Sequence, residues 1–181
     1  MNYVAAVAAA FALSACDRSL PTGPERVEAP GVSRILSLTD DEAAILADAG
    51  IAVRQPAAGE KAATGGVWYG APRAMLAFSA VLHRDGSVSG EYEYRSADGL
   101  TRLHGQVTCL TVSGTSARFS GPVTKPGLLP DQEFTVQDNG EGANDPADVV
   151  AGPLPGSSAC GPETAAPPGQ EVVQGNLQVH Q

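Results

Sequence analysis

From residue 65 onward, apolar and polar side chains alternate along the chain, and short turn sequences interrupt the alternation at regular intervals. A period of two places successive side chains on opposite faces of a strand, so each run predicts a strand with one buried face. The turn Arg84-Asp85-Gly86 lies between two such runs and predicts a β-hairpin. The runs are Leu76, Phe78, Ala80 and Leu82 before the turn, and Val88, Gly90, Tyr92 and Tyr94 after it.

The same pattern continues toward the C-terminus. Turns are expected at Ala97-Asp98-Gly99 and Ser113-Gly114, and strands around residues 117–123, 134–136 and 177–179. Strands joined by tight turns predict a mainly β fold, an antiparallel meander closing as a barrel or a sandwich. One strand is expected to carry Leu103, Gly105, Val107 and Cys109 on one face, and Arg102, His104, Gln106 and Thr108 on the other.

One short helix is expected before the strands. Thr39 followed by Glu42 matches a capping box, in which each residue's side chain bonds to the other's backbone amide. Gly50 supplies the stop, because glycine adopts the left-handed conformation that ends many helices. These signals predict a helix over about residues 40–49.

The charge of the chain is uneven. Its net charge is −9, and all of its bases lie at or before Lys125, whereas eight acids and no base follow that residue. Nucleic-acid binding needs clustered Lys or Arg, so this distribution argues against nucleic acid as a partner. Glycine (21 residues) and proline (14) are abundant and aromatic residues few, which favours short strands with many turns.

The N-terminus contains an apolar run, residues 4–13, which is too short to span a bilayer as a helix. Leu13-Ser14-Ala15-Cys16 closes this run and resembles the lipobox of bacterial lipoproteins. The resemblance implies that residues 1–15 are a signal peptide and that Cys16 becomes the lipidated first residue. The protein would then be exported and lipid-anchored to a bacterial membrane, on the periplasmic or cell-surface side.

An exported location constrains the remaining cysteines. With Cys16 lipidated, Cys109 and Cys160 are an even pair in an oxidising compartment, where a disulfide is expected. The alternative for Cys109, a catalytic thiol, needs a base to lower its pKa, and the sequence pairs no histidine with it. The chain is thus expected to contain a spacer (16–32), a short helix and connector (33–64) and a β domain (65–181).

Three motifs recur in this order in a group of exported bacterial β-domains. They are His104-Gly105-Gln106-Val107-Thr108-Cys109, Asp138-Asn139-Gly140-Glu141-Gly142-Ala143-Asn144, and Gly175-Asn176-Leu177-Gln178-Val179. The chain resembles this group over residues 65–181. The group has no assigned activity, so the resemblance implies a β fold and the cysteine pair, and it transfers no catalytic residue.

A long acidic loop is expected after Asn139. Its candidate cation ligands are Asp138, Glu141, Asp145 and Asp148, because Ca²⁺ prefers six to eight oxygen ligands on a flexible backbone. The spacing matches neither the EF-hand nor the RTX pattern, and acidic loops are commonly just solvated. A Ca²⁺ site and a plain loop both remain open; no other cofactor is expected.

No catalytic constellation emerges from the remaining residues. The histidines are His83, His104 and His180, and their positions do not suggest a zinc site. Glu91 and Glu93 share a strand face and could form a carboxylate pair, although solvation at the surface explains them better. No serine lies in a Gly-x-Ser-x-Gly context. Trp68, Tyr69, Tyr92 and Tyr94 could line a barrel mouth or pack in the core.

These observations favour a membrane-anchored lipoprotein that acts as a non-catalytic binding or interaction module in the cell envelope. Its partner would be a cation, a basic protein or another envelope component. One alternative is an enzyme with a carboxylate and histidine site, including His104, inside a β-barrel cavity. Another is a purely structural envelope protein, for which an exposed apolar or strand-edge surface is expected.

Overall fold

The structure is a computed structural model, and it describes residues 38–127, 129–142, 144–156 and 168–181. The expected signal peptide (1–15), the lipidated Cys16, the spacer (16–32) and Cys160 lie outside the described residues. The described residues, from 38 onward, belong to one compact unit, in which the helix and the connector after it pack together with the β region.

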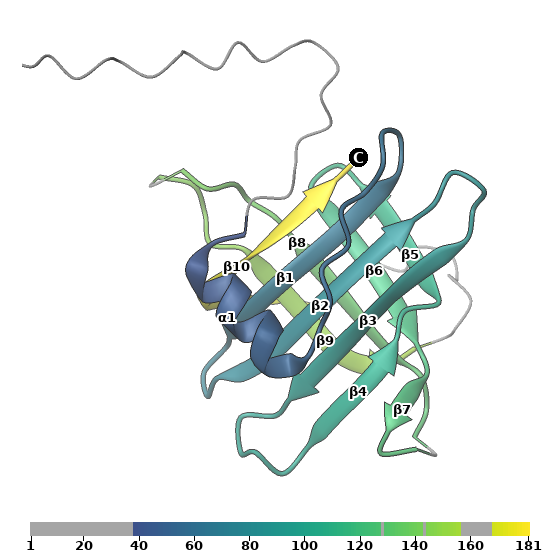
Figure 1. Cartoon of the computed structure of the whole chain (residues 1–181). Helices are drawn as coiled ribbons and strands as arrows, with labels where there is room; N and C mark the ends of the chain where they lie inside the picture. Colours follow the sequence, from purple (N-terminus) through teal and green to yellow (C-terminus); the bar gives the residue numbers. More distant parts are fainter. Residues whose placement is uncertain (1–37, 128, 143, 157–167) are drawn as a thin grey trace, which may run out of the picture. The chain divides into compact units, whose positions relative to one another are not determined.

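One helix and ten strands make up the described fold (Figure 1). All paired strands are antiparallel, and their order across the sheet is β5-β6-β8-β9-β10-β1-β2-β3-β4-β7. This architecture confirms the mainly β, antiparallel fold with one short helix. The elements are α1 (Asp40–Ala49), β1 (Lys61–Tyr69), β2 (Ala74–Leu82), β3 (Val88–Arg95), β4 (Arg102–Gln106), β5 (Cys109–Ser113), β6 (Ser116–Gly121), β7 (Val123–Lys125), β8 (Gln132–Gln137), β9 (Val149–Pro155) and β10 (Gln170–His180).

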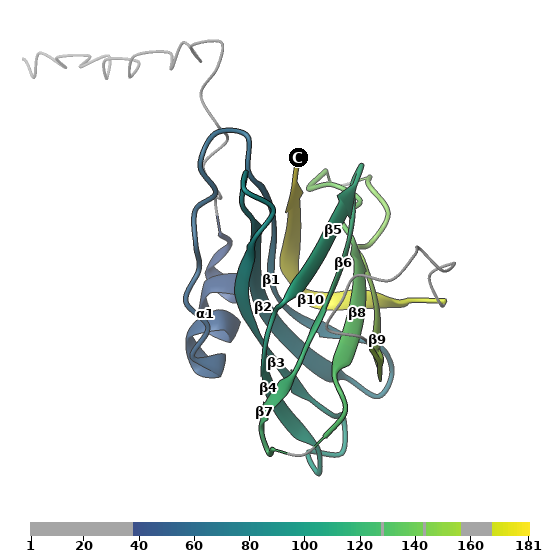
Figure 2. The same cartoon turned by 90° about the vertical axis from the view of Figure 1, so that its right-hand side faces the viewer.

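The sheet curls, and Figure 2 shows β5, β6, β8 and β9 folded across from β1 to β4. The two halves are joined at β10, which pairs with both β9 and β1. They are joined again at a bent hairpin, in which β4 continues into β5 and β6 continues into β7 after short breaks. At the bend, the Val107 amide donates to the Gly90 carbonyl (2.9 Å). The next amide, that of Thr108, donates to the Ser120 carbonyl (3.0 Å). The chain thus leaves β3 and joins β6 within two successive residues, which brings the ends of the strand order together.

This bend corrects one expectation about faces. Val107 belongs to the main core, as predicted, but after the bend Leu110 and Val112 are the core residues, not Cys109. Cys109 pairs with Ser120 on the opposite face, where both residues are buried. The inward series therefore shifts by one position. Switching pairing partners at the bend interrupts the period of two, as a β-bulge does.

Aromatic side chains fill the interior of the curl. The Phe119 ring stacks on Phe78 at a centroid distance of 4.7 Å and on Phe134 at 5.4 Å. Tyr92 packs against Phe134, and its hydroxyl donates to the Gly121 carbonyl at 3.1 Å. These four aromatic residues are fully buried. Where the sequence left barrel mouth and core open for Tyr92, the structure places it in the core.

Helix α1 covers the outer face of the sheet, over β1, β10 and β2 (Figure 1). Its bounds match the prediction: the Thr39 hydroxyl accepts from the Glu42 amide at 3.2 Å, and Gly50 ends the helix with φ +71°. Its apolar face packs on Met75 and Ala77, residues that alternate with the core residues of β2. Each face of β2 therefore has its own apolar cluster, with Trp68 packed at the edge of the outer one.

Two strands depart from the predicted pattern. The stretch 139–169 was expected to be irregular throughout, whereas Val149–Pro155 forms β9, in which Val150 pairs with Val136 of β8. The glycines and prolines around this strand hide it from sequence patterns, because they are typical of loops. The β region also begins at Lys61, before the expected boundary at residue 65.

Candidate functional site

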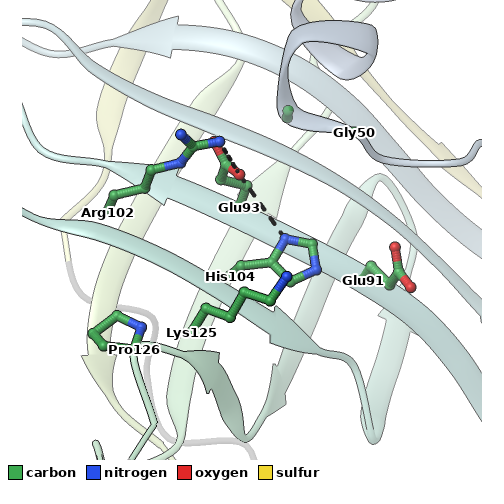
Figure 3. A pocket seen from close by; sticks show the side chains of 8 residues that line it. Gly50, Glu91, Glu93, Arg102, His104, Lys125 and Pro126 are labelled. Carbon is green, nitrogen blue, oxygen red and sulfur yellow. Dashed lines mark hydrogen bonds and ion pairs between the residues drawn. The ribbon is translucent and has the colours of Figure 1, made fainter.

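A groove of about 620 Å³ lies on the outer face of the sheet, beside the end of α1 (Figure 3). Its volume is in the range of pockets that hold small molecules, about 300–1,000 Å³. Strands β3, β4 and β7 supply most of the lining, and the end of α1 borders it. The lining residues are Ala49, Gly50, Glu91, Glu93, Arg102, His104, Lys125 and Pro126.

Strand alternation explains why polar side chains meet here. Tyr92 and Tyr94 of β3 pack in the interior, so Glu91 and Glu93, which alternate with them, project to the outer face. On β4, Gly105 faces inward, where a side chain would collide with the Tyr92 ring. The neighbouring residue His104 consequently faces the groove.

Glu93 is the fixed centre of this site. Its side chain is only 3 % exposed, and its carboxylate is held by Arg95 at 2.6 Å and Arg102 at 3.0 Å. Arg95 also binds Asp48 of α1 at 2.6 Å, so the same network ties the helix to β3. A buried carboxylate is tolerated when charged partners replace its lost water, as these two guanidinium groups do.

The strand register extends this centre into a row across three strands. Glu93 pairs with His104 on β4, and His104 pairs with Lys125 on β7. The His104 Nδ1 atom lies 3.9 Å from a Glu93 carboxylate oxygen, as the dashed line in Figure 3 marks. Because paired strands are about 4.8 Å apart, the backbone of the row spans roughly 10 Å. The row runs from an acid through an imidazole to an ammonium group.

Lys125 at the β7 end of the row and Arg102 on β4 carry positive charges that can contact a ligand. Lys125 is exposed and makes no ion pair with any other residue that the structure describes. The Arg102 side chain is 62 % exposed, so it retains donors beyond those that contact Glu93. Glu91 also lines the groove, one strand repeat from Glu93. The groove thus offers cationic donors near β7 and a carboxylate on β3.

The sequence predicted some residues of this site but placed them on the wrong face of the sheet. Glu91, Glu93 and His104 do come together, but on the outer face, whereas the alternative reading put a carboxylate and histidine site inside a barrel cavity. Buried aromatic and aliphatic side chains fill the interior instead. His83 and His180 are absent from the groove lining. Arg102 was assigned to the polar face, while Lys125 reaches the site through the β4 and β7 pairing, which no local pattern indicates.

Hydrogen bonds within the acidic loop and from β10 hold its carboxylates in place. Asp138 accepts from the Gly140 and Val179 amides, and Asp148 accepts from the Asn139 amide at 2.9 Å. Glu141 accepts from the Asn176 side chain at 2.6 Å, and Asp145 accepts from the Gly142 amide at 2.7 Å. Among the described residues, no group of three or more His, Cys, Asp and Glu side chains is placed to hold a metal ion.

The cysteine assignments stay predictions. Cys109 begins β5 and is buried, at 4 % exposure, while its expected disulfide partner Cys160 and the expected lipidation site Cys16 lie outside the described residues. Within the described ranges, no helix combines the length and apolar character needed to cross a membrane. Comparison of the chain with protein-family models, curated proteins and solved structures finds no match.

Proposed function

We propose that this chain is a membrane-anchored lipoprotein of the bacterial cell envelope whose β domain is a binding module. The anchor rests on the Leu13-Ser14-Ala15-Cys16 sequence and the apolar run before it. The binding role rests chiefly on one observation, the outer groove built around the buried, doubly paired Glu93. A charged network held in place before a ligand arrives lowers the cost of ordering the site on binding.

The ligand that best fits this groove is a small zwitterion. Lys125 and Arg102 offer donors for an acidic group at the β7 side, where His104 can add a hydrogen bond. Glu91 offers an acceptor for an amino group on β3. The Glu93 carboxylate is buried and paired with Arg95 and Arg102, so it positions these donors and is not itself the contact for the ligand's amine. A short peptide with free ends meets these requirements.

Reversing the charge of Lys125 should weaken such binding. We expect Lys125→Glu to lower the affinity of the full chain for trialanine about tenfold or more, because a charge-assisted hydrogen bond contributes roughly 1.5–3 kcal/mol. Isothermal titration calorimetry at low ionic strength measures the change. Added salt should reduce this change in affinity, since the site is open to solvent and its charges are screened.

Lys61→Glu is the matched control for this experiment. It makes the same change at the only other lysine of the chain, which does not line the groove. The control variant should bind trialanine as the unmodified chain does. Absence of trialanine binding to the unmodified chain, or equal losses in the two variants, would contradict the groove assignment. Mass spectrometry of the mature N-terminus tests the anchor separately, since an unacylated Cys16 contradicts it.

A further inference from the structure

Three polar side chains form a hydrogen-bonded chain outside the groove lining. His83 Nδ1 lies 2.8 Å from a Glu60 carboxylate oxygen, and His83 Nε2 lies 2.8 Å from the Ser89 hydroxyl. The three residues come from different segments: Glu60 precedes β1, His83 follows β2, and Ser89 is on β3. No local sequence pattern connects the three residues, so only the folded chain brings them together.

The positions of the hydrogens among these three side chains follow from which of their atoms can only accept. Hydrogen bonding to His83 and to the Ala57 amide holds the pKa of Glu60 below its usual range, so this carboxylate only accepts. His83 Nδ1 must therefore carry the hydrogen that it shares with Glu60. In the neutral imidazole, Nε2 is then left as an acceptor, and the Ser89 hydroxyl donates to it. This is the arrangement of a nucleophile, a base and a residue that orients the base.

The surrounding structure holds each member in place. The second carboxylate oxygen of Glu60 accepts from the Ala57 amide at 2.9 Å, which fixes the acid. His83 sits at the start of the β2–β3 turn, where its amide donates to the Ser87 carbonyl and its carbonyl accepts from Gly86. Ser89 lies within the paired strands β2 and β3, opposite Val81. The His83 side chain is 32 % exposed and Ser89 is half-buried, so small reagents can reach both.

We propose that Ser89, His83 and Glu60 form an acyl-transfer site that cleaves esters of small carboxylic acids. The Ser89 oxygen attacks the ester carbonyl carbon while its proton passes to His83 Nε2. The C–O bond to the leaving alcohol then breaks, and the alcohol takes that proton, which leaves an acyl group on Ser89. Water attacks the acyl group with His83 as base, and Ser89 recovers its proton as the carboxylic acid departs. Glu60 is the positioning residue, because it holds His83 in the reactive tautomer.

The location of Ser89 suits a substrate bound nearby. Ser89 and Glu91 alternate with the inward residues of β3, so both project to the outer face, roughly 7 Å apart along the strand. Since Glu91 lines the groove, the nucleophile stands one strand repeat from its lining. The acyl-transfer site itself uses no groove residue and does not depend on ligand binding there.

A fluorophosphonate probe tests this site directly. Attack by Ser89 forms a phosphorus–oxygen bond, releases fluoride and passes the serine proton to His83, so an activated serine is labelled covalently. We expect the full chain to be labelled at Ser89, as located by peptide mass spectrometry, and to hydrolyse p-nitrophenyl acetate above the background rate. Ser89→Ala should abolish labelling, and His83→Ala should slow it at least tenfold.

Further variants distinguish a catalytic role of the three side chains from a purely structural one. Ser96→Ala is the control, because the Ser96 hydroxyl donates to Asp98 and has no histidine partner; it should leave labelling unchanged. Glu60→Gln should slow labelling, because a neutral amide does not favour the hydrogen on His83 Nδ1 as a carboxylate does, and Glu60→Asp, which keeps the carboxylate, should restore part of the rate. No labelling, labelling elsewhere than Ser89, or labelling at Ser89 that ignores His83 would overturn the proposal. The three side chains would then be only a structural tie between β1 and the β2–β3 hairpin.

Discussion

Replacing Phe119 with alanine is expected to lower the free energy of unfolding by about 3–5 kcal/mol, the usual cost of removing a buried aromatic ring. Phe119 is fully buried and contacts three other rings, those of Phe78, Tyr92 and Phe134. These rings come from both halves of the curled sheet, so the Phe119 side chain packs the two halves against each other, and Phe119→Ala removes that contact. Urea denaturation of the full chain, with the free energy extrapolated to water, measures the change.

Leu100→Ala is the control for this experiment, because Leu100 is 87 % exposed in the turn between β3 and β4. Its effect should stay within about 0.5 kcal/mol, as is typical for surface substitutions. Phe119→Leu should cost less than Phe119→Ala, since it fills part of the cavity. Equal effects of Phe119→Ala and Leu100→Ala would mean that the interior is not close-packed.

Glu42→Gln is expected to stabilise the protein at alkaline pH and to leave its stability nearly unchanged near pH 4. The Glu42 side chain is buried between α1 and the sheet, where one carboxylate oxygen accepts a 3.4 Å hydrogen bond from Gln178. The other oxygen has no hydrogen-bond partner in the part of the chain that the structure describes. Burial, with repulsion from Glu141 and Asp148, raises the pKa of Glu42 from 4.5 to about 7.

The sign of this effect follows from the two protonation states. Well below pH 4.5 Glu42 is neutral in the folded and unfolded chains, so its titration does not change the free energy of unfolding. As the pH rises toward 7, the unfolded chain ionises first, and stability falls by up to about 3 kcal/mol before it levels off. Glutamine does not ionise, so Glu42→Gln should remove most of this loss at pH 8.

Thermal and urea unfolding at pH 4, 6 and 8 test this prediction. Asp41→Asn is the matched control, because Asp41 lies beside Glu42 in the first turn of α1 but is exposed. The control should change stability by less than about 1 kcal/mol, with little dependence on pH over this range. If the Glu42→Gln variant is no more stable than the unmodified chain at pH 8, as at pH 4, then Glu42 is solvated in the folded protein.

Local signals explain which elements the sequence could predict. Thr39, Glu42 and Gly50 act within one helix, so the bounds of α1 follow from cap chemistry alone. Tight turns such as Asp85-Gly86 set the hairpins in the same way. The shift of faces after Val107 has no such signal, because it arises when the chain exchanges β3 for β6 as its partner. Strand β9 was missed because no tight turn joins it to β8, its pairing partner, and because the glycines and prolines in and around it are typical of loops.

Local patterns likewise predict only some of the residues that line the candidate groove. Alternation placed Glu91 and Glu93 on one face of a strand and His104 on the polar face of another, which the structure confirms. Alternation cannot say whether a polar face turns inward or outward, and the buried aromatic rings decide that question here. The helix end and Lys125 reach the groove only through tertiary packing, so no spacing in the sequence could have included them.

We expect ligands to bind on the outer face of the sheet and not inside its curl. Two-dimensional NMR of the isotope-labelled full chain, titrated with trialanine, tests it most directly. The backbone signals of Gly50, Glu91, His104 and Lys125 should shift together and saturate, while those of Phe119 and Phe134 should stay in place. Shifts concentrated at Phe119, Phe134 and their interior neighbours, or no saturable shift at the groove residues, would contradict it.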